Sequence, residues 1–167
     1  MVQKLNVQID LPKLLQLYQH AEDHFPWTKS FPTLQSGISV AKGNEDDLIG
    51  CCGGNFTEEQ EKLYSQLHSF YQNSYISELS SLLQLKIFRL RWMKLSGKSC
   101  YSFHQDWTRR LHIPIITSKD SYFLFQSPLE LAQLEVNHAY VVDTTRVHTA
   151  MNTGPHTRVH LIACFAE

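Results

Sequence analysis

The sequence has no long apolar run and almost no excess of charge. No stretch approaches the roughly 18 to 20 apolar residues that cross a bilayer, and the N-terminus lacks the apolar segment of a signal peptide. The 167 residues carry a formal net charge of -1, which argues against general binding to nucleic acid or anionic lipid, because both need a basic excess. We therefore expect a cytoplasmic protein with no membrane span and no nucleic-acid partner.

Cysteine is also scarce, with four residues at Cys51, Cys52, Cys100 and Cys164. Their spacing does not fit a zinc knuckle, and adjacent cysteines do not easily bond to each other. Reduced, structural thiols are the expected state. The sequence contains no repeat, low-complexity tract or flexible linker, and its length suits one compact core. We expect a single domain over residues 1–167.

The first half of the chain predicts helices and loops. Asp10 can cap a helix with a proline in its first turn. Thr57, with a glutamine three residues on, starts a capping box, and helical spacing continues from there toward Leu83. The acidic run Glu58–Glu61 is expected to be a solvated helix start. Between the two helices, residues 28–56 are glycine-rich and predict an irregular connection.

The second half has a β-rich composition with period-two alternation. Several short strands at close spacing are typical of a β-sandwich or barrel. We expect residues 1–84 to be helical support and loops, and residues 85–167 to be a metal-binding β-barrel core. The predicted strands are Lys86–Leu95, Ser99–Phe103, Leu111–Thr117, Tyr122–Gln126, Ala139–Val142, Val147–Met151 and Arg158–Phe165.

Histidine is concentrated in this second half, where six of the nine lie in residues 104–167. His104 and Asp106 stand two residues apart, so on a strand their side chains share one face. A third metal ligand must come from a distant segment; His148 is the best candidate, and His156, which adjoins a turn proline, is its alternative. Two imidazoles and a carboxylate form the facial triad of non-haem Fe(II) oxygenases.

Arg158 follows His148 by ten residues, beyond a turn that would make a hairpin. Its planar guanidinium suits a bidentate contact to a carboxylate. Period two places His160 on the same strand face, while Val159 and Leu161 alternate with them, as expected for a strand that packs against helices. The ordered combination of His-x-Asp, a distant histidine and then an arginine is stronger evidence for such an oxygenase site than any one of these elements alone.

These residues resemble the aspartyl/asparaginyl β-hydroxylase family of Fe(II)- and 2-oxoglutarate-dependent dioxygenases, whose bacterial members include free-proline and lipid hydroxylases. The similarity covers about residues 86 to 165. It implies a mainly β fold with N-terminal helices, a double-stranded β-helix (jelly-roll, cupin-like) barrel. The matching segments are Gly97, His104-Gln105-Asp106, Arg110-Leu111-His112-Ile113-Pro114-Ile115, Val147–Asn152 and Arg158-Val159-His160-Leu161-Ile162.

The resemblance also implies roles for single residues. Fe(II) would be held by His104, Asp106 and His148. Arg158 would bind the distal carboxylate of the cosubstrate 2-oxoglutarate, and His112 would help to hold the same molecule.

Two further positions are implied to lie near the cosubstrate. Arg110 belongs to the same motif as His112. His160 stands where many related dioxygenases have serine or threonine, and it would donate the same second hydrogen bond.

The expected function is hydroxylation of an aliphatic C–H bond in an amino acid, a peptide side chain or a related small substrate, with O2 and 2-oxoglutarate consumed. Trp107 either walls the substrate pocket or packs at the barrel mouth. The alternative is a non-catalytic, cupin-like metal-binding or sensor module. Arg158 discriminates between the two, because a metal site alone does not need it. The sequence indicates no oligomeric state.

Overall fold

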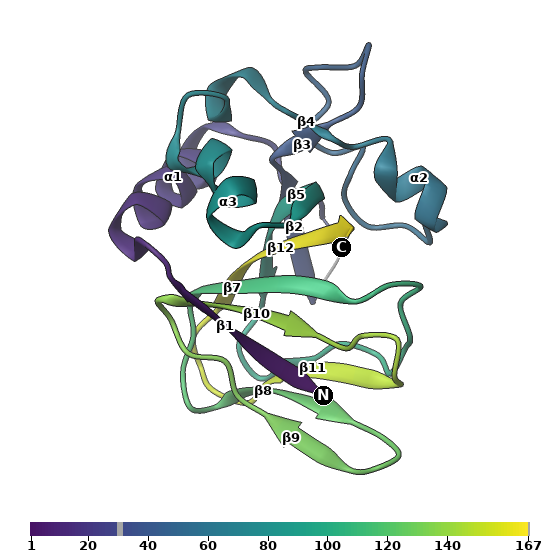
Figure 1. Ribbon diagram of the computed structural model, residues 1–167. Helices are drawn as coiled ribbons and strands as arrows, with labels where there is room; N and C mark the ends of the chain where they lie inside the picture. Colours follow the sequence, from purple (N-terminus) through teal and green to yellow (C-terminus); the bar gives the residue numbers. More distant parts are fainter. Residues whose placement is uncertain (30–31, 167) are drawn as a thin grey trace.

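The computed structural model describes residues 1–29 and 32–166, which form two facing antiparallel sheets with helices on one outer side (Figure 1). None of the helices in these residues is both long and apolar enough to cross a membrane. In chain order the elements are β1 (Val2–Gln8), α1 (Leu11–His24), β2 (Thr33–Gly37), β3 (Ser39–Val40), α2 (Glu58–Lys62), β4 (Gln66–Leu67), a 3-10 turn (Ser69–Tyr71), α3 (Tyr75–Leu83), β5 (Lys86–Leu95), β6 (Ser99–Cys100), β7 (Arg110–Ile116), β8 (Ser121–Phe125), β9 (Glu130–Ala132), β10 (His138–Val142), β11 (His148–Asn152) and β12 (Arg158–Ala166).

The larger sheet has the strand order β1-β10-β7-β12-β5-β2, and we call it the major sheet. The smaller one, with the order β6-β11-β8-β9, is the minor sheet. A separate pair is formed by β3 and β4. The mainly β fold with an N-terminal helix is the predicted one. The expected hairpin between the strands of His148 and Arg158 is wrong, because β11 and β12 follow each other in sequence but lie in opposite sheets.

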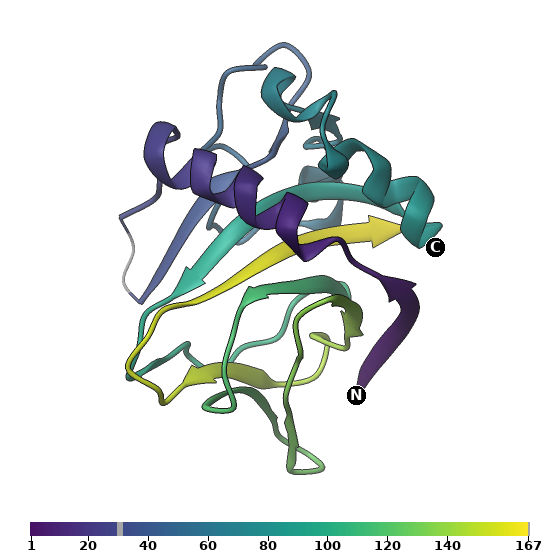
Figure 2. The same ribbon diagram turned by 90° about the vertical axis from the view of Figure 1, so that its left-hand side faces the viewer.

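Alternation along β12 separates the two faces of the major sheet. Val159 and Leu161 belong to the apolar core beneath α1 and α3, and Figure 2 shows α1 lying across this face. Arg158 and His160 point to the opposite side, toward the minor sheet, and both are buried. The predicted packing of β12 against helices is confirmed.

The face of the major sheet turned toward the minor sheet is unusually polar. Buried charged or polar side chains there come from β5, β7 and β12, namely Arg91, Arg110, His112, Arg158 and His160. A small apolar cluster, which includes Leu95, Phe123 and Phe125, fills part of the same space. Buried polar groups destabilise a fold unless they are paired, so this layer is where a site is expected.

One helix from Thr57 toward Leu83 is a wrong prediction. The capping box is present, but α2 ends after five residues, and the Tyr64 carbonyl then accepts the N–H of Arg89 from β5 at 2.7 Å. A new helix, α3, begins where the Ser74 hydroxyl accepts the N–H of Ile76. Local side-chain caps of this kind compete with helix continuation.

The first half of the chain also contributes two strands to the major sheet that the sequence did not predict. β1 pairs with β10 at one edge of the major sheet and β2 pairs with β5 at the other. Their apolar alternation is weak because β1 is an exposed edge strand and because inward residues of β2, such as Gln35, line a polar cavity. The short β9 was likewise missed.

All four cysteines are free. Cys51 and Cys52 lie with their sulfur atoms 3.9 Å apart. The expectation of reduced thiols therefore matches the structure.

Candidate metal centre and its cavity

Three predicted ligands come together between the sheets. His104, Asp106 and His148 each offer one ligand atom, and these atoms lie within 4.8 Å of one another. His148 is the first residue of β11, whereas His104 and Asp106 lie in the connection between β6 and β7. This set of two imidazoles and one carboxylate has the donor chemistry of a non-haem Fe(II) site.

Backbone pairing brings these distant segments together. His104 and His148 exchange N–H···O hydrogen bonds of 3.0 and 2.9 Å. Two residues on, the N–H of Asp106 donates to the Thr144 carbonyl at 2.8 Å. The connection therefore runs antiparallel to the segment that leads into β11, and side chains at positions 104 and 106 share a face as predicted.

Both imidazoles are oriented by backbone carbonyls. Nδ1 of His104 lies 2.8 Å from the Ser102 carbonyl, and Nδ1 of His148 lies 2.9 Å from the Arg146 carbonyl. A carbonyl only accepts, so each Nδ1 carries the proton and each Nε2 keeps its lone pair for a metal. Burial lowers the pKa of His148, and nearby His104 acts in the same direction, which favours the neutral form that binds metal.

A cavity of about 490 Å³ opens beside the three ligands. It extends from the minor sheet across β5 and β12 to β2 and to residues 53–56, which precede α2. The lining includes all three candidate ligands and several predicted cosubstrate residues. The predicted site residues in the lining are His104, Asp106, His148, Trp107, Arg110, His112 and Arg158; the other lining residues are Thr33, Gln35, Gly53, Gly54, Asn55, Phe56, Glu61, Arg89, Arg91, Met93, Leu95, Tyr101, Ser102, Gln105, Phe123, Thr144, Ala150 and Ile162.

Arg158 is a buried cation that faces this cavity. It is 2% exposed, its Nε has no hydrogen-bond partner, and within residues 1–29 and 32–166 no carboxylate pairs with it. Its guanidinium carbon lies 5.6 Å from the centre of the Phe123 ring. Burial lowers the pKa of Arg158 to about 10, so the side chain remains charged at neutral pH and can bind an anion.

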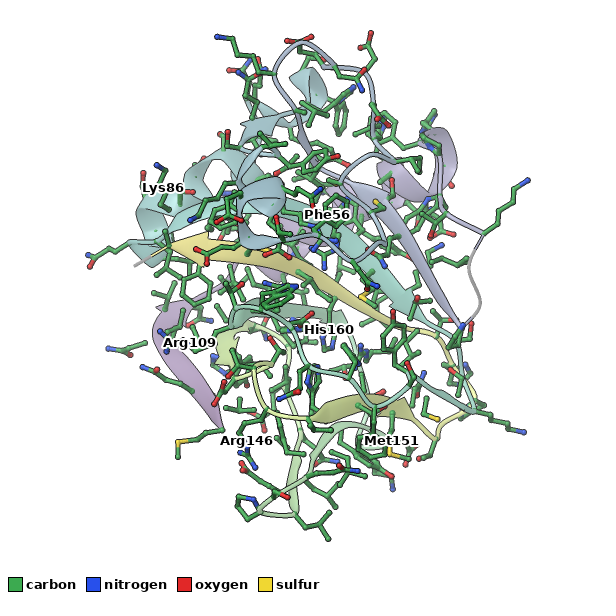
Figure 3. The ribbon with its side chains drawn as sticks, turned by 90° about the vertical axis from the view of Figure 1, so that its right-hand side faces the viewer. Phe56, Lys86, Arg109, Arg146, Met151 and His160 are labelled. Atoms are coloured by element: carbon green, nitrogen blue, oxygen red, sulfur yellow. The ribbon has the colours of Figure 1, made fainter. Side chains whose placement is uncertain are left out.

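His112 and His160 form a buried pair next to Arg158. Their Nδ1 atoms are 3.4 Å apart, and burial, with Arg158 nearby, holds the pKa of each well below its usual range. His112 reaches the cavity, whereas His160 does not line it. Among the described residues, no group forms a hydrogen bond with Nε2 of His160. Figure 3 shows His160 below β12 and Phe56 beside α2.

Arg110 makes its contacts with protein groups. It bonds to Thr108 and to both carboxylate oxygens of Glu61, the shorter contact being 2.6 Å, and it lies 3.4 Å from Asp106. The Glu61 carboxylate also accepts from Arg89 at 2.6 Å. Glu61 is 1% exposed, so the prediction that it is solvated is wrong. Through Arg110, it links α2 to the candidate metal ligand Asp106.

Two other candidates lie away from the ligand cluster or at its rim. His156, the alternative third ligand, is exposed in the turn before β12, and its carbonyl accepts a hydrogen bond from the Asn152 amide. Trp107 lines the cavity yet is 73% exposed. The tryptophan therefore stands at the cavity mouth, where a substrate can contact it.

Sequence reasoning missed the arginines of β5. Arg89 and Arg91 both line the cavity, and the available signal was their alternation with Leu90 and Trp92 in a strand otherwise suited to a core. Arg89 has a positive φ of 51° at a break in register with β12. Such a bulge re-aims a side chain, here toward Glu61.

Comparison with known proteins bears on the fold. No family model matches the sequence, and no curated protein matches it at a significant level. Among solved structures, the chain is similar to an oxidoreductase of the 2OG-Fe(II) oxygenase family from Burkholderia pseudomallei, with 12% identity and a TM-score of 0.56 over 90% of this chain and 76% of that one. It is also similar to SnoN, a non-haem alpha-ketoglutarate-dependent epimerase from nogalamycin biosynthesis, with 12% identity and a TM-score of 0.61 over 99% of this chain and 77% of that one. The predicted jelly roll is thus confirmed: this chain has the fold of 2OG-Fe(II) oxygenases.

Proposed function

We propose that this chain is an Fe(II)- and 2-oxoglutarate-dependent dioxygenase that hydroxylates an aliphatic C–H bond of a small substrate or a peptide side chain. One observation carries the proposal. A His-Asp-His cluster faces the same cavity as the buried guanidinium of Arg158, which has no carboxylate partner among the residues that the structure describes. A module that only binds a metal does not need such a cation. A keto-diacid that chelates the metal does, because its far carboxylate can pair with the guanidinium.

The ligand residues have separate tasks. His104 and His148 would donate Nε2, and Asp106 a carboxylate oxygen, to Fe(II), which leaves other coordination positions open. Bound iron would supply the activation of O2, coupled to decarboxylation of 2-oxoglutarate to succinate. The backbone bonds to both imidazoles hold their orientation, as supporting groups do in metal sites.

Other cavity residues would position the organic molecules. Arg158 would bind the distal carboxylate of 2-oxoglutarate, and neutral His112, which lines the same cavity, would help to hold this molecule. His160 would act by orienting His112 through their Nδ1 contact. Apolar side chains such as Phe123 exclude water from the reacting atoms, and Trp107 would contact substrate at the mouth.

Within this class we infer a relationship to the aspartyl/asparaginyl β-hydroxylases. Support comes from the Arg-x-His-x-Pro segment, which begins β7. Its Arg110 lies 3.4 Å from Asp106, and its His112 lines the cavity. We propose that Arg110 contributes to the cosubstrate site mainly by holding Asp106, because its other contacts go to Glu61 and Thr108.

Anaerobic spectroscopy tests the proposal. Protein loaded with Fe(II) should develop a weak visible charge-transfer band when 2-oxoglutarate is added, and should release succinate when O2 and a substrate follow. His148→Ala should abolish the band, whereas His156→Ala, at an exposed histidine, should keep it. A wild-type protein with neither band nor succinate would favour the non-catalytic metal-binding module. A band that survives in His148→Ala would mean that the ligands are misassigned.

A further inference from the structure

The cavity contains more positive charge than the protein neutralises. Four arginines line it: Arg89, Arg91, Arg110 and Arg158. Arg89 and Arg110 share the Glu61 carboxylate. For Arg91, as for Arg158, no carboxylate forms an ion pair in the described part of the chain. Two cations in one buried space therefore lack a counter-charge.

Neutral groups hold Arg91 in place without compensating its charge. Its Nε donates to the Gln35 side-chain oxygen at 2.9 Å, and its Nη1 donates to the Arg89 carbonyl at 3.0 Å. The same Gln35 oxygen accepts the N–H of Gly53 at 3.2 Å. Arg91 is only 7% exposed, so solvent screens its charge weakly. This is an orientated, buried cation with donor capacity left for a ligand.

Arg91 and Arg158 stand at different levels along the sheet and are held against different groups, Arg91 against Gln35 of β2 and Arg158 against the ring of Phe123 of β8. Arg158 is paired with Leu95, and Arg91 precedes Leu95 by four residues on β5. At about 3.3 Å per residue their backbones are roughly 13 Å apart along the strand direction. His112 on β7 is level with Arg91, because both are paired with Ile162 of β12. One 2-oxoglutarate bound at Arg158 would leave Arg91 unpaired.

We propose that Arg91 is the binding site for a carboxylate of the substrate. The inference rests on the proposed dioxygenase function and narrows its substrate class to small molecules with a free carboxylate, such as amino acids. A buried unpaired cation is destabilising, and an anionic ligand relieves that penalty. The carboxylate lies against Arg91 on β5, beside Gln35 and the loop that carries Phe56, and the rest of the molecule extends toward the metal ligands.

Matched acids and amides test this directly. The probes are the free amino acids, each compared with its own carboxamide, and the readout is substrate-stimulated succinate release. At least one acid should stimulate release ten-fold or more above its amide, because the amide keeps the shape and loses the charge. The proposal is wrong if no acid exceeds its amide. This comparison uses the wild-type protein and does not depend on any variant folding.

Two arginine variants separate the two anion sites. Arg91→Gln should lower the association constant for the preferred acid, measured by calorimetry, at least ten-fold. The charge-transfer band with 2-oxoglutarate should persist in this variant. Arg158→Gln should abolish the charge-transfer band with 2-oxoglutarate and should bind the preferred acid as tightly as the wild-type protein does. Arg91→Lys should restore part of the acid binding. Lys4→Gln, at an exposed cation that pairs with Glu135 at 3.7 Å, should change neither the acid binding nor the band.

The outcomes distinguish this inference from the proposed function. If wild-type protein shows no band but binds the acid through Arg91, the anion site stands and the dioxygenase proposal fails. If the band forms and Arg91→Gln binds the acid as tightly as wild type, the dioxygenase proposal stands and Arg91 is not the substrate site.

Discussion

At the scale of single residues, Arg158 is the side chain whose environment most clearly requires a ligand. Arg158→Ala should raise the 2-oxoglutarate concentration required for half-maximal succinate release by roughly 30-fold or more, since truncating one partner of a buried charged pair costs about 2 kcal/mol or more. Steady-state kinetics at saturating iron would measure this. If this 2-oxoglutarate concentration is unchanged, another cation binds the distal carboxylate, and Arg110 is the next candidate.

The residues found from sequence are those that a local spacing rule or the family resemblance singles out. His104 and Asp106 are two apart, and period two then fixes their common face. Glu61 and Arg91 escaped because their roles depend on which strands lie side by side. A glutamate at a helix start is ordinarily solvated, and only the approach of β5 and β7 to α2 buries it between Arg89 and Arg110.

At the scale of elements, the Glu61 carboxylate holds α2 against the major sheet through ion pairs with Arg89 of β5 and Arg110 of β7. Glu61→Gln should lower the free energy of unfolding by about 3–5 kcal/mol, because it leaves two buried guanidiniums without their counter-charge. Urea unfolding of the metal-free protein would measure the loss. Glu58→Gln is the matched control: its pair with Lys62 is half-exposed, and such pairs contribute about 0–1 kcal/mol.

The same variant has a second readout at the metal. Arg110 contacts both Glu61 and Asp106, so loss of the glutamate frees Arg110 to shift toward the ligand carboxylate. Glu61→Gln should therefore weaken Fe(II) binding, and Glu58→Gln should not. Equal iron affinity in the two variants would restrict Glu61 to a stabilising role.

The turn between β5 and β6 is a place where only glycine fits. A Cβ on Gly97 would lie 2.3 Å from the Pro155 carbonyl oxygen, and the next residue, Lys98, donates its N–H to the Gly154 carbonyl at 2.9 Å. Gly97→Ala should thus push apart two turns that precede β6 and β12. We expect a loss of about 1–3 kcal/mol and a raised 2-oxoglutarate requirement, since Arg158 begins β12.

Gly43→Ala separates backbone strain from this steric effect. Gly43 has a φ of 82°, and a Cβ added there would meet nothing within 4 Å, so alanine costs only the left-handed backbone conformation, about 1–2 kcal/mol. Its 2-oxoglutarate requirement should stay at the wild-type value. If both variants raise that requirement equally, the contact with Pro155 does not position Arg158.

Most strands of the second half were predictable because they have an apolar face, which packs under the helices for the strands of the major sheet and in the small cluster between the sheets for β8 and β11. β1, β2 and β9 were not, since edge strands and strands that line a polar cavity lack that alternation. The helix from Thr57 failed for another reason. Helical spacing of apolar residues continues through residues 63–76, yet the chain turns back to pair β4 with β3, and no local pattern encodes that pairing.

At the scale of the whole molecule, apolar packing and chemistry are divided between the two faces of the major sheet. The large apolar core lies under α1 and α3, and the polar layer lies on the other face, between the two sheets. That layer contains buried groups which prefer to be neutral. Its cost to stability therefore depends on pH, through His112 and His160.

Acid should destabilise the metal-free protein through these two histidines. Both have folded-state pKa values well below 6.5, so below about pH 6.5 the unfolded chain binds protons that the folded chain refuses, and stability falls as pH falls. Between pH 6.5 and 5.5 each histidine should cost about 1 kcal/mol. Urea unfolding with chelator present would measure it. His160→Phe should remove about half of this pH dependence of stability, because it removes one of the two buried rings that resist protonation. His156→Gln should remove none, because His156 is exposed. If the free energy of unfolding changes with pH equally in all three proteins, His112 and His160 are protonated as easily in the folded chain as in the unfolded one.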